Sequence, residues 1–167
     1  MFTKYERSMY EEACNYIRAA EILVRKIAST GNAAPMLNVL GMEILLKCAL
    51  RVSGVKYARK HDYYDLWKSL PKQAQLDILE AANQRIPAYV DLDDIEGLMK
   101  AYKKIFMKTR YSYEVYEGNI EDKAKKGKEW VVAGCPLEDA DFVFYPEELT
   151  CIIYGLTTYL DTHLYRA

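Results

Sequence analysis

The sequence predicts an all-α protein, an up-and-down bundle of about five to six helices. Over most of the 167 residues, apolar side chains recur every three or four positions, which is the spacing of amphipathic helices. Hydrophobic residues make up 51% of the chain and charged residues 28%, as in a globular protein that buries a core without disulfides or metal ions. Glycine, proline and aspartate separate the periodic windows, as they do at helix ends. We expect residues 1–167 to form one domain.

The first two predicted helices form an antiparallel hairpin. Residues 5–28 carry apolar side chains at helical spacing, and a second helix is predicted over 35–53. Glu43 and Lys47 form an i,i+4 pair beside the apolar stripe of this second helix. Gly41 lies inside the helix at a cost of about 1 kcal/mol relative to alanine, which indicates close approach of the first helix. The predicted stripe comprises Leu37, Leu40, Gly41, Ile44, Cys48 and Val52.

Three shorter signals place the next helices. A basic loop over 55–61 is followed by Asp62, which can cap a short helix over 62–69. Another helix is predicted over 71–83, and a long one over 91–116, because aspartates there suit the positive end of a helix dipole. The apolar positions of the 71–83 helix are Leu76, Leu79 and Ala82. Those of the long helix are Leu98, Tyr102, Ile105, Thr109, Tyr113 and Tyr116.

The helical period disappears in the 118–146 insertion. Residues 121–128 predict a charged loop, since no apolar repeat runs through them. The β-prone runs Trp130–Val132 and Phe142–Tyr145 allow a small β-hairpin within the insertion. The period returns in a last helix, predicted over 147–165. The insertion can be a lid, an interface or a connecting loop.

Composition argues against several classes of protein. A net charge of −1 gives no overall attraction to nucleic acid or anionic lipid, so any nucleic-acid surface has to be a local patch. We expect a cytoplasmic protein without membrane contact, because no uninterrupted apolar run approaches the ~18–20 residues of a membrane span. The four cysteines lack C-x-x-C spacing and are expected to be reduced. No metal and no cofactor is expected, because the two histidines lack di-iron spacing and no phosphate-loop or dinucleotide motif occurs.

One stretch has the composition of a site, residues 108–117 at the end of the long helix. It combines Arg110 with three tyrosines and two carboxylates. Arg110 can pair with Glu114 one turn away, or it can hold an external anion with its planar fork of donors. The lysines of the same helix form either a solvated face or part of an anion site. The 15 tyrosines of the chain suit bundle rims, oligomer interfaces or base-stacking surfaces.

Four segments, individually weak as motifs, occur in a specific order and spacing over about two thirds of the chain. They are Ala20–Leu23, Gly41–Leu50, His61–Leu66 and a long helix that ends in Arg110–Glu114. In this order the chain resembles the HEPN superfamily. The resemblance implies an α-helical bundle, often dimeric, of prokaryotic defence and toxin–antitoxin systems or beside minimal nucleotidyltransferases. It also implies, for many members, a metal-independent ribonuclease with an Arg-x(4–6)-His motif at the dimer cleft.

The chain departs from that motif at its histidine. Arg110 matches the arginine, but Val115, Tyr116 and Glu117 stand where the histidine is expected, and tyrosine, with an ordinary pKa of about 10, is a poor acid–base group. We therefore expect a non-catalytic HEPN-like homodimer that binds a nucleotide, an RNA backbone or a partner protein. The alternatives are a divergent metal-independent endoribonuclease and a helical assembly protein without an anion site. The predicted ligand-binding residues are Arg110, Lys103, Lys108, Tyr111 and His61, and the candidates for catalysis are Arg110, Tyr113, Glu114 and Tyr116.

Overall fold

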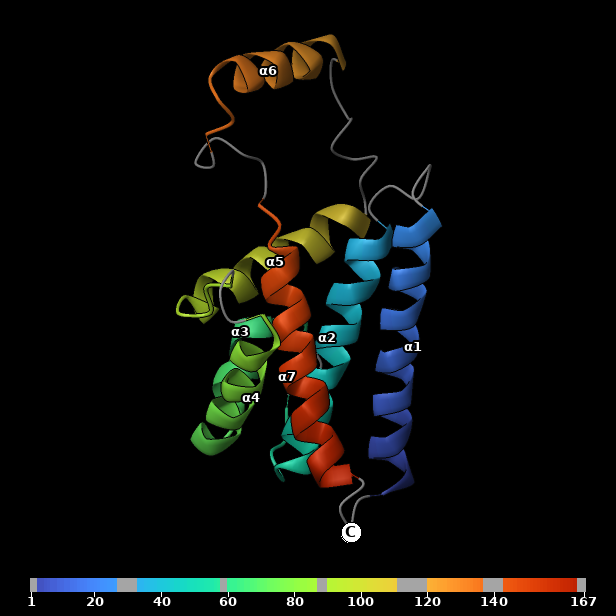
Figure 1. The fold of residues 1–167 in the computed structure, drawn as a ribbon. Helices are drawn as coiled ribbons and strands as arrows, with labels where there is room; N and C mark the ends of the chain where they lie inside the picture. The colour runs from blue at the N-terminus through green and yellow to red at the C-terminus, as the bar shows by residue number, and fades with distance from the viewer. Residues whose placement is uncertain are drawn as a thin grey trace.

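Seven α-helices make up the regular structure that the computed structural model describes (Figure 1). The described residues are 3–26, 33–57, 60–86, 90–110, 120–136 and 143–164. They contain no strand, so the prediction of an all-α bundle is confirmed. The helices are α1 Lys4–Lys26, α2 Ala33–Val52, α3 Tyr63–Ser69, α4 Lys72–Arg85, α5 Ile95–Arg110, α6 Ile120–Val132 and α7 Pro146–Leu164.

Helix α2 is the central element of the bundle. It packs against α1, α7, α5 and α3, and it therefore buries residues on several sides. The single stripe expected from the sequence was incomplete, because Val39, Met42 and Leu46 lie outside that stripe and are fully buried. By length and composition α2 could cross a membrane, and 56% of its apolar window is buried inside the bundle. This apolar character serves the packing of α2 against four neighbouring helices.

Two glycines let pairs of helices approach closely. A Cβ atom at Gly41 would stand 2.7 Å from Ile17 Cγ1 and 3.2 Å from the carbonyl oxygen of Ala13, which confirms that α1 crosses α2 at this glycine. A Cβ atom at Gly155 of α7 would stand 2.3 Å from the carbonyl oxygen of Ile78 in α4. The bundle is consequently built from two tight pairs, α1 with α2 and α4 with α7.

Helices α3 and α5 begin after capping aspartates. Asp62 Oδ1 accepts the N–H three residues on at 3.1 Å, as predicted. Asp94 Oδ1 accepts the Gly97 N–H at 2.8 Å, and α5 begins at residue 95 rather than at 91. The helix starts later because a capping side chain keeps its own residue outside helical geometry. The predicted continuation of this helix over 111–116 lies outside the described residues.

The insertion contains a helix that the sequence analysis did not predict. Helix α6 includes residues 121–128, so the prediction of a charged loop there was wrong. It also includes Trp130–Val132, which the sequence had allowed as one strand of a small hairpin. Its lysines, glutamates and alanine favour helix, and Gly134 ends it with a φ of 87°. Residues 143–145 have no regular structure, and Phe142 lies outside the described residues. In Figure 1, α6 stands beyond the end of the bundle where α5 crosses it.

The described core draws side chains from every helix except α6. Leu98, Tyr102 and Ile105 of α5 are buried as predicted. In α4, Leu76 is 49% exposed and Ile78 is buried instead. Ala82 is buried as predicted and Leu79 packs half-buried against the core, so only the prediction for Leu76 was wrong. The buried stripe of α4 consists of Ala74, Ile78 and Ala82.

Candidate functional site

A buried carboxylate on α2, Glu43, organises the junction of α2, α3 and α5. Its exposed fraction is only 2%. Lys47 Nζ donates to Oε1 at 2.6 Å, and His61 Nδ1 lies 2.9 Å from both carboxylate oxygens. A carboxylate without such partners would be costly to bury, so the network ties the loop before α3 to α2. The Glu43–Lys47 pair was predicted from the sequence, whereas its burial and its third member were not.

The His61 ring is held on two sides. Its centroid lies 5.1 Å from that of Phe106 on α5, and Nδ1 faces Glu43. Because a carboxylate oxygen accepts hydrogen bonds, Nδ1 is the donor in this contact and Nε2 is left for another partner. The side chain is 48% exposed. His61 is therefore a half-exposed imidazole whose orientation is fixed by Glu43 and Phe106.

Asp62 joins the cap of α3 to α5. Lys103 Nζ donates to Asp62 Oδ2 at 2.6 Å, while Oδ1 caps the helix. The hydrogen bond from Lys103, followed by the one from the α3 backbone, lowers the pKa of Asp62. Lys103 and Phe106 thus lie on one stripe of α5, and the backbone of Arg110 follows one turn later on the same stripe.

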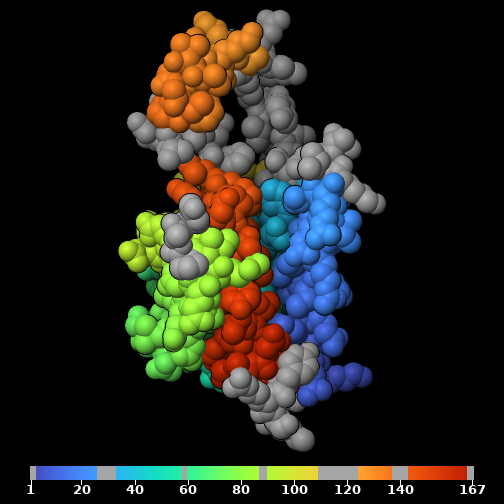
Figure 2. Space-filling view, in the orientation of Figure 1, coloured from blue at the N-terminus to red at the C-terminus, as the bar shows by residue number. Residues whose placement is uncertain are grey.

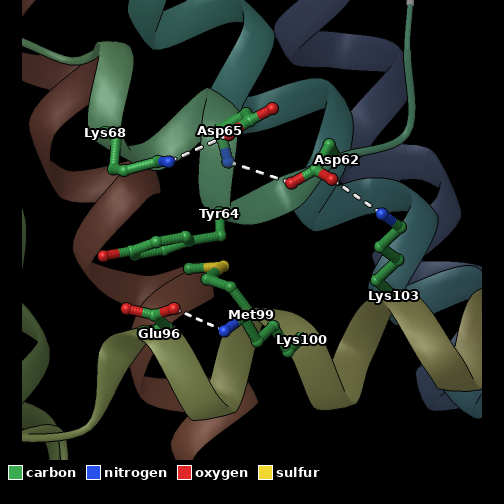
Figure 3. Close-up of a pocket in the computed structure, with 8 residues that line it drawn as sticks. All are labelled: Asp62, Tyr64, Asp65, Lys68, Glu96, Met99, Lys100 and Lys103. Carbon is green, nitrogen blue, oxygen red and sulfur yellow. Dashed lines mark hydrogen bonds and ion pairs between the residues drawn. The ribbon is translucent and has the colours of Figure 1, made fainter.

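A pocket of about 310 Å³ opens beside Asp62, between α3 and α5 (Figure 3). Tyr64 extends across it, with Lys68 Nζ 4.5 Å from the ring centroid. Each of its three lysines has a carboxylate partner on the lining: Lys103 with Asp62 at 2.6 Å, Lys68 with Asp65 at 3.0 Å, and Lys100 with Glu96. The pocket is charge-balanced, so an anion could bind here only by displacing a carboxylate.

A second surface, around the loop between α2 and α3, has an excess of cations. We call it the loop surface, and its residues are Tyr5, Arg51, Lys56, Tyr57, Lys60 and Lys68. Two hollows of about 430 and 480 Å³ share Lys56 and Tyr57. The carboxylate on their described lining is Asp65, and both Lys60 and Lys68 bind it. Lys56 has no ion pair within the described part of the chain.

Aromatic rings lie against the cations of the loop surface. The Arg51 guanidinium is 4.7 Å from the centroid of Tyr5, and Lys47 Nζ is 5.9 Å from that of Tyr57. Since Lys47 also binds Glu43, the loop surface is continuous with the Glu43–His61 network. Tyr5 is exposed and Tyr57 is half-buried against the core. An exposed ring beside arginine can stack a flat group while the cation contacts phosphate.

The structure brings together only part of the predicted site. His61 and Lys103 both lie near the start of α3, but His61 contacts Glu43 and Lys103 binds Asp62. Lys108 lies on α5 and is partly buried. The side chain of Arg110 and all of Tyr111, Tyr113, Glu114 and Tyr116 lie outside the described residues, so the candidates for catalysis stay predictions. No group of three metal-ligating side chains occurs in the described ranges.

The sequence had shown the 55–61 loop to be basic, but of its residues only His61 was predicted to bind a ligand. Its cations meet Arg51 and Lys68 only through the packing of α2 and α3, so no spacing along the chain reveals the cluster. No family model matches the sequence, and neither a curated protein nor a solved structure is significantly similar to it.

Proposed function

We propose that the chain is a non-catalytic, HEPN-like binding module that holds an RNA backbone or a nucleotide on its loop surface. The observation that carries this proposal is the excess of cations around two adjoining hollows, in a chain whose net charge is −1. Contacts from lysine and arginine to phosphates supply most of the sequence-independent affinity for nucleic acid. Tyr5, which is 58% exposed, offers a ring to an unstacked base, so single-stranded RNA suits the surface better than a duplex.

A binding measurement with matched lysine variants tests the proposal. Fluorescence anisotropy with a labelled single-stranded RNA, in the absence of metal ions, should show binding that Lys56→Ala weakens about tenfold, the scale of a charge-assisted hydrogen bond. Lys72→Ala is the control, because Lys72 is also exposed but lies on α4 outside the loop surface. Equal effects of both substitutions would contradict a local site, and absence of binding would favour a partner-protein or assembly role.

The resemblance to HEPN proteins supports a homodimer in the cytoplasm of a prokaryote, within a defence or toxin–antitoxin-type system. The 15 tyrosines can supply interface area with polar tips. Light scattering at micromolar concentration should therefore give about twice the chain mass of 19.3 kDa. A monomeric mass under these conditions would contradict the dimer.

A divergent metal-independent endoribonuclease is the second candidate, and one observation favours it. The buried carboxylate of Glu43 holds His61 through Nδ1 while the ring stays half-exposed, which is how a carboxylate orients an acid–base histidine. In this candidate His61 takes the role of the histidine that 115–117 lack. This candidate predicts that RNA is cleaved in the presence of a chelator, and that His61→Gln abolishes cleavage while Lys72→Ala does not. That result would favour the ribonuclease over the non-catalytic binding module.

A further inference from the structure

Helices α1 and α7 both pack on α2 but make no extensive contact with each other. Gly41 draws α1 onto α2, and Gly155 draws α7 onto α4, so a groove is left between the two pairs. The groove has a volume of about 370 Å³, and residues of α1, α2, α4 and α7 line it. In Figure 2 it lies between the blue α1 and the red α7, where the cyan start of α2 shows between them.

Two arginines from different helices line this groove, Arg18 of α1 and Arg85 of α4. Neither guanidinium has a carboxylate partner within the described ranges. Arg85 lies over the ring of Tyr154, 5.5 Å from its centroid, a contact that fixes the guanidinium without using its N–H donors. Glu21 is the acidic residue of the lining, so the cations are in excess. Two unneutralised guanidiniums around one hollow favour an anion with several acceptor oxygens.

The rest of the lining adds apolar contact to this charge. Ile17 of α1 and Ile153 of α7 face the same hollow as Tyr154. A volume of about 370 Å³ lies at the lower end of the range of small-molecule sites, about 300–1,000 Å³, so the groove suits a compact ligand. A ligand that uses the whole lining has an anionic end for the arginines and a flat apolar body for the ring and the isoleucines.

We propose that the groove between α1 and α7 binds a small organic oxyanion, a phosphate or carboxylate carried on a flat apolar group. Arg18 and Arg85 hold the anionic oxygens, and Tyr154 with the two isoleucines contacts the flat group. This site is separate from the loop surface. Asn38 in the groove and Arg51 on the loop surface are about 20 Å apart along α2, at 1.5 Å per residue. The inference is therefore independent of the proposed function.

Isothermal titration calorimetry with phenyl phosphate tests the site, because this probe combines a dianion with a flat ring. We expect millimolar or tighter binding, weakened about tenfold by Arg18→Gln and by Arg85→Gln. Arg25→Gln is the matched control, since Arg25 lies two turns further along α1, is exposed and is not part of the lining. The Arg25→Gln variant should bind phenyl phosphate within twofold of the affinity of the original protein. Circular dichroism should confirm that each variant is folded.

Three further probes and one variant separate the contributions. Inorganic phosphate should bind more weakly than phenyl phosphate, and Tyr154→Leu should reduce that difference. Benzoate binding as tightly as phenyl phosphate would assign the site to carboxylates, and weaker benzoate binding would assign it to phosphates. No heat with phenyl phosphate or benzoate at millimolar concentration, or equal weakening by Arg25→Gln and Arg18→Gln, would overturn the inference.

Discussion

The buried carboxylate of Glu43 is contacted by two partners from different directions. Lys47 comes from the same helix, one turn on, and His61 comes from the loop before α3. The first contact is local and could be predicted from the i,i+4 spacing. The second joins residues 18 positions apart, and no periodicity of the sequence contains it. The same limit concealed the contact of Arg51 with Glu6 across 45 positions.

Removing the Glu43 carboxylate should leave buried charge without compensation. Glu43→Ala removes the ion-pair partner of Lys47, whose side chain is 16% exposed, and also the contact that holds His61 to α2. We expect the free energy of unfolding to fall by about 3 kcal/mol in urea denaturation. Glu129→Ala on α6, where Lys125 is 3.9 Å away and both side chains are exposed, should change it by less than about 0.5 kcal/mol. Similar losses in both variants would contradict this account of Glu43.

Glu6 at the start of α1 should make stability depend on acid pH. Hydrogen bonds from the Thr3 hydroxyl, and then from Arg51, outweigh burial and lower the pKa of Glu6 from 4.5 to about 2. The folded state therefore binds fewer protons than the unfolded state between these values, and the Glu6 contribution is lost as pH falls from about 4.5 to about 2. Urea unfolding should show the advantage of the original protein over Glu6→Gln shrinking across this window. An advantage that stays constant would contradict the assignment, and Glu12→Gln on the exposed face of α1 is the control.

At the scale of elements, the sequence predicted where most helices lie better than it predicted which helices pack against each other. Asp62 caps the start of α3, and Gly54, with a φ of 73°, follows the end of α2 at Val52. Both residues lie next to the helix end concerned, so the local sequence is enough to predict these ends. Helix α6 was missed because apolar residues are few in its lysine-rich first half, and because Trp130, Val131 and Val132 at its end also favour a strand. The several buried sides of α2 follow from its central place, which depends on how α3, α5 and α7 pack around it.

Gly155 and Gly127 both lie inside helices, but only Gly155 lies where another helix packs closely. In Gly155→Ala the new methyl group would meet the Ile78 carbonyl oxygen at 2.3 Å, so α4 and α7 must move apart. Overpacking costs about 1–3 kcal/mol, more than the gain in helix propensity of about 1 kcal/mol, and the urea midpoint should fall. Gly127→Ala on α6 meets nothing within 4 Å and should leave the midpoint unchanged or raise it. A lower midpoint for Gly127→Ala, or a raised one for Gly155→Ala, would contradict this packing.

At the scale of the whole molecule, charge is distributed unevenly although its sum is near zero. The pocket between α3 and α5 matches three lysines with three carboxylates. On the loop surface, Lys60 and Lys68 share Asp65, Arg51 binds Glu6, and Lys56 adds a further cation. The sequence predicted that any nucleic-acid surface would be a local patch but placed it on the long helix. Which lysines can bind a phosphate depends on which of them lack a carboxylate partner in the folded structure. Lys103 has such a partner, Asp62.

The salt dependence of RNA binding tests the central claim most directly. For single-stranded nucleic acid, the logarithm of the binding constant falls with the logarithm of the salt concentration, with a slope of about −0.7 for each phosphate contact. If the loop surface holds the backbone, Lys56→Ala should flatten this slope by about 0.7, while Lys72→Ala on α4 should leave it unchanged. Identical slopes for the original protein and the Lys56 variant, or no binding of RNA at low salt, would contradict the claim.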